Sequence, residues 1–167
     1  LAFSGLQPYF SHHSIVDTVL NSMLGGDVHS LLFEVVREQL GLAYSVYSVS
    51  SRYLSTVLVM AGVAPDRVDQ ALQAMLDQVA QLQRGEFPDV LLNRAKTLVD
   101  SHIRSIPDDL DSLLAHLMNG VTLGRSISVQ DSLSLLGSVT REQVIARARQ
   151  LELKSSFILT AKENGHD

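Results

Sequence analysis

The chain has 167 residues, of which 46% are hydrophobic and 19% are charged, and its formal net charge is −5. This length suits one domain with a sizeable core, so we expect residues 1–167 to form a single domain. The basic residues are scattered singly rather than gathered in a stripe, which argues against nucleic acid or an anionic membrane surface as a partner. No apolar run approaches the roughly 18 residues of a membrane-spanning helix, so we expect no such helix.

The chain contains no cysteine, which excludes a disulfide, a thiol nucleophile and thiolate metal ligands. It begins LAFSGL, without a methionine and without a basic-then-apolar leader. We therefore expect no signal peptide, and we interpret the chain as a piece of a longer one. These features favour a cytoplasmic over an exported location without deciding it.

The first half of the chain predicts a strand, two helices and a hairpin. LAFSGL is short and apolar and predicts a strand, and SIVDTVLNSMLGG has the apolar spacing of a helix that ends in two glycines. Asp27 is expected to cap the next helix, which ends at Gly41. The two β-branched runs at residues 43–51 and 55–63 then predict an antiparallel hairpin. The second run is apolar on both faces, so we expect it at the centre of a sheet.

The second half is predominantly helical. Apolar stripes predict helices over residues 65–84, 88–103, 107–120, 128–138 and 138–151. Thr140 and Gln143 have the spacing of a capping box, and SSFILTAK predicts a closing strand. Strands and clustered helices in this order indicate an α+β two-layer sandwich, in which helices pack on one face of a mostly antiparallel sheet of about four strands.

Metal and hydrolase motifs are missing from the sequence. Neither H-E-x-x-H nor H-x-x-E-H occurs around any of the six histidines, which are His12, His13, His29, His102, His116 and His166. There is no G-x-S-x-G elbow, and the carboxylates of PDDLD complement the dipole of a helix start. We therefore predict no metal site and no catalytic residue in this chain.

The stretch REQLGLAYSVYS carries two side chains that packing alone does not require. Arg37 lies outside the apolar stripe near the end of its helix, where a cation is mildly stabilising. Tyr44 opens the next strand, and its hydroxyl needs a partner if it is buried. The turn at Gly41 lets a helix end and a strand start face the same region. From these residues alone, both an ordinary structural role and a binding role are open.

NSMLGGDVHSLLFEVVREQLGLAYSVYS resembles the signature of the C-terminal half-domain of the pitrilysin, insulinase and mitochondrial processing peptidase family of inverted zincins. FSGL, GVAPDRVDQAL and SVTREQVIARARQ are similar to three other parts of that half-domain, in the same order. The resemblance implies a two-layer sandwich that occurs in paired homologous halves. It also implies that the other half holds the zinc and activates the water.

The resemblance assigns Arg37 and Tyr44 to substrate binding. An arginine fork can bind a carbonyl or carboxylate of an extended peptide, and a tyrosine hydroxyl can hydrogen-bond the scissile carbonyl as it gains negative charge. Residues 30–33 read Ser-Leu-Leu-Phe where many members have Ser-Arg-Leu-Phe, so one polar contact is expected to be missing. This chain alone is predicted to be inactive, with no cofactor of its own.

The leading hypothesis is therefore a substrate-binding, non-catalytic half of a zinc-dependent peptidase. Its expected partners are a homologous zinc-bearing half-domain or subunit and an extended peptide that adds to an open sheet edge. A homodimer that packs as the two halves would is left open. The alternative is a structural or interaction subunit with no role in turnover, in which Arg37 and Tyr44 are relics. A metal-free hydrolase is a third interpretation that we do not expect.

Overall fold

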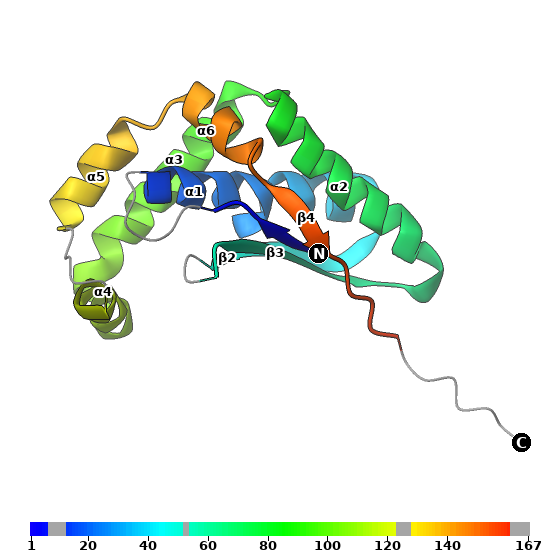
Figure 1. Cartoon of the computed structure of the whole chain (residues 1–167), viewed down its shortest axis with the longest axis horizontal. Helices are drawn as coiled ribbons and strands as arrows, with labels where there is room; N and C mark the ends of the chain where they lie inside the picture. Colours follow the sequence, from blue (N-terminus) through cyan, green and yellow to red (C-terminus); the bar gives the residue numbers. More distant parts are fainter. Residues whose placement is uncertain (7–12, 52–53, 123–127, 161–167) are drawn as a thin grey trace, which may run out of the picture.

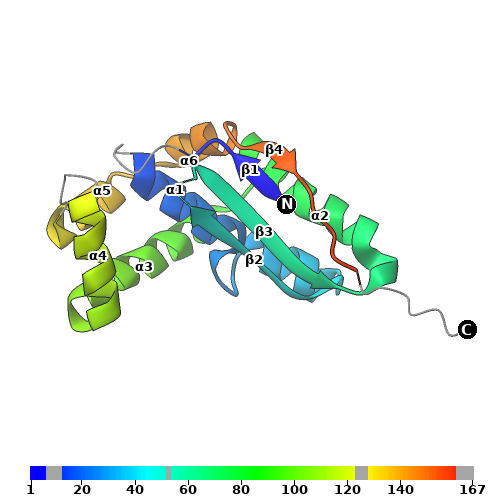
Figure 2. The same ribbon diagram turned by 60° about the horizontal axis from the view of Figure 1, so that its bottom comes forward.

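The structure is a computed structural model, and it describes residues 1–6, 13–51, 54–122 and 128–160. Within this part of the chain, one antiparallel sheet has the strand order β2–β3–β1–β4. Its strands are β1 (Ala2–Ser4), β2 (Ala43–Ser51), β3 (Thr56–Val63) and β4 (Glu152–Ser155). The helices cover one face of this sheet (Figure 1), and Figure 2 turns the uncovered face towards the viewer. The predicted α+β two-layer sandwich is confirmed.

The helical layer follows the predicted order. Its members are α1 (His13–Asn21), η1 (Ser22–Gly26), η2 (Leu32–Gln39), η3 (Pro65–Arg67), α2 (Val68–Arg84), α3 (Asp89–Ser105), η4 (Ile106–Asp108), α4 (Leu110–Thr122), α5 (Val129–Gly137) and α6 (Arg141–Ala148). The capping box at the start of α6 is confirmed, because the side chains of Thr140 and Gln143 each accept a backbone N–H of the other residue.

The hairpin and the core also agree with the sequence pattern. β2 and β3 pair from Ala43↔Val63 to Ser51↔Thr56, and β3 lies between β2 and β1, as its two apolar faces predict. The core lies between the sheet and the helices. Its large, fully buried apolar side chains are Leu20, Met23, Leu24, Leu32, Leu82, Val19, Val36, Val57, Val59 and Val144.

The predicted cap at Asp27 is wrong. Its Oδ1 accepts the backbone N–H of His29 at 2.5 Å, and the helix begins only at Leu32. An aspartate that bonds the backbone two residues ahead forms a turn of its own, and this turn competes with helix capping.

The closing strand also lies earlier than predicted. β4 covers Glu152–Ser155, residues 156–160 form no regular element, and residues 161–162 of the predicted strand lie outside the described residues. The physical reason is the length of the neighbour: β1 has 3 residues, and its pairing with β4 runs from Ser4↔Glu152 to Ala2↔Ser155. A strand can extend only as far as another strand supplies backbone partners.

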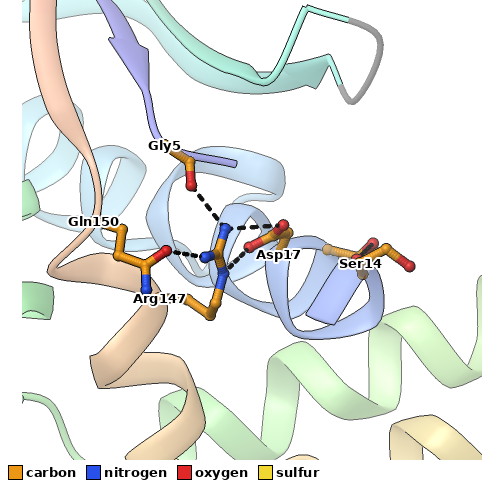
Figure 3. Close-up of polar contacts among 6 residues, drawn as sticks. Gly5, Ser14, Asp17, Arg147 and Gln150 are labelled. Atoms are coloured by element: carbon orange, nitrogen blue, oxygen red, sulfur yellow. Dashed lines mark hydrogen bonds and ion pairs between the residues drawn. The ribbon is translucent and has the colours of Figure 1, made fainter. Parts of the chain in front are cut away.

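A buried ion pair ties the helical layer to the end of β1 (Figure 3). Arg147 of α6 and Asp17 of α1 have side chains that are only 4% and 1% exposed, and Arg147 Nε lies 2.7 Å from Asp17 Oδ1. Arg147 also donates to the carbonyl oxygen of Gly5 at 2.8 Å and to the side chain of Gln150. Gly5 has a φ of +122°, and a β-carbon there would lie 2.0 Å from the Gln150 carbonyl oxygen, so this junction requires glycine.

Replacing Arg147 with methionine should lower the free energy of unfolding by about 3–5 kcal/mol, because it leaves the Asp17 carboxylate buried without its cation. Urea titration followed by circular dichroism measures the change. The matched control is Arg104→Met on α3, which removes an exposed ion pair with Asp100 and should cost less than about 1 kcal/mol. Equal effects of the two substitutions would contradict the assigned role of the buried pair.

Candidate functional site

Arg37 lies on an unusually wound helix. η2 is a π-helix of 8 residues, and beyond its end the N–H of Leu40 donates to the carbonyl oxygen of Val35, five residues back, at 3.0 Å. π-helical turns are rare and frequently occur at functional sites. Residues four apart share a face here: Leu32 and Val36 are fully buried, whereas Arg37 points outward. Leu32 and Val36 therefore form the buried stripe of this helix, and the guanidinium lies on its solvent side.

The guanidinium of Arg37 contacts two neighbouring side chains and still remains accessible to solvent. Its Cζ lies 4.6 Å from the centre of the Phe33 ring, one π-turn earlier, which orients the plane of the group. Arg37 Nε lies 3.4 Å from Glu38 Oε1, and the Arg37 side chain is 42% exposed. An exposed ion pair contributes little free energy, so a carbonyl or carboxylate from another molecule can replace it.

A tight corner joins η2 to β2. Gly41 has a φ of +58°, and a β-carbon added there would meet no atom within 4 Å, so backbone conformation rather than space calls for glycine. The N–H of Leu42 donates to the carbonyl oxygen of Val36 at 2.9 Å. Nη1 of Arg67, on η3, donates to the carbonyl oxygen of Gly41 at 3.3 Å. These bonds hold the helix end and the strand start together.

Tyr44 occupies a β-bulge directly after the corner. Ala43 pairs with Val63 and Ser45 pairs with Gly62, so Tyr44 is the extra residue of β2. It is 71% exposed. A β-carbon at Gly62 would lie 3.5 Å from Cδ2 of Tyr44, which shows that the phenol ring lies over this glycine. β-Bulges commonly re-aim a side chain beside a functional site.

An open groove of about 740 Å³ adjoins the same corner. Its lining includes Leu40 and Leu42, which flank Gly41, and the remaining lining residues are Asp66, Arg67, Gln70, Gln73, Ala74 and Asp77. Sequence reasoning missed this groove, although the run of polar residues early in GVAPDRVDQALQ was the available signal. Amide and guanidinium groups of this kind can hydrogen-bond a peptide backbone, but they supply no nucleophile.

The described residues do not fit a zinc site. Within the described ranges, no three histidine, aspartate or glutamate side chains lie close enough together to hold a metal ion. His29 and His102 are exposed and His116 is half-buried, while His12, His166 and the side chain of His13 lie outside the described residues. No helix in the described part is long and apolar enough to cross a membrane.

Residues 1–99 match the family described as the peptidase M16 inactive domain. The fold resembles that of a conserved protein from Enterococcus faecalis, known from a crystal structure, with a TM-score of 0.85 at 20% identity. That match covers 91% of this chain and 36% of the other. This chain therefore belongs to the peptidase M16 inactive-domain family, and the resemblance in its sequence is confirmed.

The chain is also similar in sequence to two proteins from Bacillus subtilis. The chain is 32% identical over 155 residues to "Uncharacterized zinc protease YmxG", which covers 90% of this chain and 37% of that protein. It is 26% identical over 145 residues to "Probable inactive metalloprotease YmfF", which covers 87% of this chain and 34% of that protein. The chain thus spans about a third of the length of these relatives.

Substitutions of Gly41 test whether the positive φ at this corner is what requires glycine. Gly41→Ala should lower the free energy of unfolding by about 1–2 kcal/mol, because alanine is strained in the left-handed region. Gly41→Asn should cost less, since asparagine tolerates this conformation. Denaturant unfolding of both variants measures the difference. If alanine is tolerated as well as asparagine, the left-handed turn is not what requires glycine here.

Proposed function

We propose that this chain is the substrate-binding, non-catalytic half of a zinc-dependent peptidase. The observation that carries the proposal is the corner at Gly41, where an outward guanidinium and an outward phenol lie on either side of one turn. The chain's membership of an inactive peptidase domain family supports it. The zinc and the base would come from a separate homologous half.

Each of the two side chains has a definite chemical role in this proposal. Arg37 donates hydrogen bonds to a backbone carbonyl or a carboxylate of an extended peptide and so fixes its position. Tyr44 donates its hydroxyl hydrogen to the scissile carbonyl, a bond that strengthens as negative charge develops on that oxygen. β2 is an outer strand of the sheet, and an extended peptide beside it can add backbone hydrogen bonds. The metal in the other half supplies the activated water.

A structural or interaction subunit is the second candidate, and one observation favours it. α4 exposes large apolar side chains at the spacing of a helix-packing seam: Leu110 (77%), Leu114 (54%), Leu117 (51%) and Val121 (84%). Exposed apolar stripes mark interaction surfaces. The relative named as an inactive metalloprotease is consistent with such a role. In that case the corner would not contribute to turnover.

Substitutions in the corner separate the two candidates. With the zinc-bearing half of the parent protein present, Tyr44→Phe should lower kcat by about a hundredfold, because a donor to the developing charge is lost. Arg37→Ala should mainly raise KM, because it removes a positioning contact. Steady-state cleavage of a fluorogenic peptide measures both constants. The control is Arg84→Ala, which removes an exposed arginine at the end of α2 that pairs with Glu86. Turnover unchanged in both corner variants would favour the structural role.

Metal analysis of the purified chain tests the division of labour between the halves. We expect substoichiometric zinc by plasma mass spectrometry and an unfolding temperature unaffected by EDTA, since structural metal binding would contribute to folding stability. One tightly held zinc ion per chain would show that this half carries a metal site of its own.

A further inference from the structure

The uncovered face of the sheet carries an apolar patch beside the corner. Its side chains come from two cross-strand pairs of β2 and β3, and their exposed fractions are Tyr47 (45%) with Met60 (39%) and Val49 (44%) with Leu58 (36%). The Tyr47 hydroxyl donates to the sulfur of Met60 at 3.7 Å, which joins one pair across the strands. The helices pack on the opposite face, and Figure 2 looks onto the strands from the uncovered side.

The bulge places this apolar patch and Tyr44 on one continuous surface. Side chains three apart in a regular strand point to opposite faces, so Tyr44 and Tyr47 would be separated without it. With Tyr44 as the extra residue, Ser45 and Tyr47 follow on the outward side, and Tyr44 and Ser45 are both exposed. A peptide held at Tyr44 can therefore continue directly over the apolar patch.

The charge of the surface limits what it can accept. β1, β2 and β3 contain no aspartate, glutamate, lysine, arginine or histidine. A charged side chain laid on this patch would lose hydration and find no counter-charge, which is unfavourable. The occupant that matches the patch presents uncharged apolar side chains.

The area of the patch favours a short peptide over a second copy of the chain. At roughly 200 Å² for a large side chain, the four exposed fractions leave on the order of 300 Å². A stable protein interface needs about 800 Å² from each partner. A patch of this size instead suits a few residues of an extended segment that is already anchored nearby.

Resting on the function proposed above, we infer that the substrate segment next to the residue held by Arg37 and Tyr44 leaves the edge of β2, crosses the uncovered face and packs apolar side chains on Tyr47, Met60, Val49 and Leu58. This surface would select substrates with alternating apolar residues, because alternate side chains of an extended peptide point to the same side. The residues at the corner would position the backbone of the peptide, and the apolar patch would determine which peptide sequences bind best.

The test compares two fluorescein-labelled peptides of about ten residues, one with leucine and phenylalanine at alternate positions and one with aspartate there. Fluorescence anisotropy should show the apolar peptide binding this chain at least about tenfold more tightly. Met60→Lys should reduce or reverse that ratio. Val49→Thr, which keeps the side-chain shape, should reduce it with little effect on folding. Leu98→Lys on α3, a position 42% exposed, should leave the ratio unchanged.

The outcomes separate this inference from the function on which it rests. A ratio that is the same in the parent chain, Met60→Lys and Val49→Thr overturns the inference. If Arg37→Ala and Tyr44→Phe still weaken both peptides in that case, the proposed function stands without it. If neither corner variant changes either affinity, or neither peptide binds, the proposed function fails and the inference fails with it.

Discussion

The ion pair between Asp17 and Arg147 is the constraint on which the rest of the structure depends. It joins α1 to α6 across 130 residues of sequence, and the same guanidinium holds the carbonyl group at the end of β1. A buried ion pair of this kind contributes little net stability compared with apolar packing, but losing one partner is costly. The Asp17–Arg147 pair instead favours one arrangement of the helices over the sheet, because other arrangements would leave a buried charge unpaired. α1 ends at Asn21, which forms hydrogen bonds with Ser48 of β2, so the same arrangement helps to hold the helical layer against β2.

On this scaffold, two local irregularities flank Gly41 and define the candidate site. In the π-helix before it, Arg37 lies on the exposed side while Leu32 and Val36 lie in the core. The bulge after it makes Tyr44 an extra residue that stands on the uncovered face of the sheet. Either irregularity costs regular hydrogen bonding, and such departures are concentrated where a side chain must be aimed. That both lie within one short segment is the strongest structural support for a binding role.

The proposed role as one half of a peptidase would explain these local irregularities beside Gly41. The described residues supply donors, a groove and an uncharged apolar surface, but no cluster that could hold a metal ion. Binding energy gained along a peptide can be used to align its reacting bond elsewhere. Division of labour between two halves would place recognition in one and hydrolysis in the other. The two relatives from Bacillus subtilis are about two and a half times the length of this chain, which leaves room for such a second half.

Periodicity in the sequence was enough to predict the fold, because helical stripes and alternating strands are local properties. It located the hairpin and the central position of β3, and the spacing of Thr140 and Gln143 located the capping box of α6. It did not predict the pairing of Asp17 with Arg147 or the early end of β4, because both depend on partners distant in the sequence. Arg37 and Tyr44 were proposed as substrate-binding residues from their positions outside the packing pattern and from the family resemblance, and their roles stay predictions. The π-winding of η2, the bulge at Tyr44 and the groove beside Gly41 leave no periodic signal.

A double-mutant cycle on peptide binding tests the central claim most directly. Isothermal titration of the apolar peptide against the parent chain, Arg37→Ala, Tyr44→Phe and the double variant gives the coupling free energy between the two side chains. If both side chains hold one stretch of the bound peptide, each single variant should weaken binding and the losses should be non-additive by about 0.5 kcal/mol or more. Additive losses would show that the two side chains contribute independently, and parent affinity in both single variants would contradict the claim that they bind this peptide.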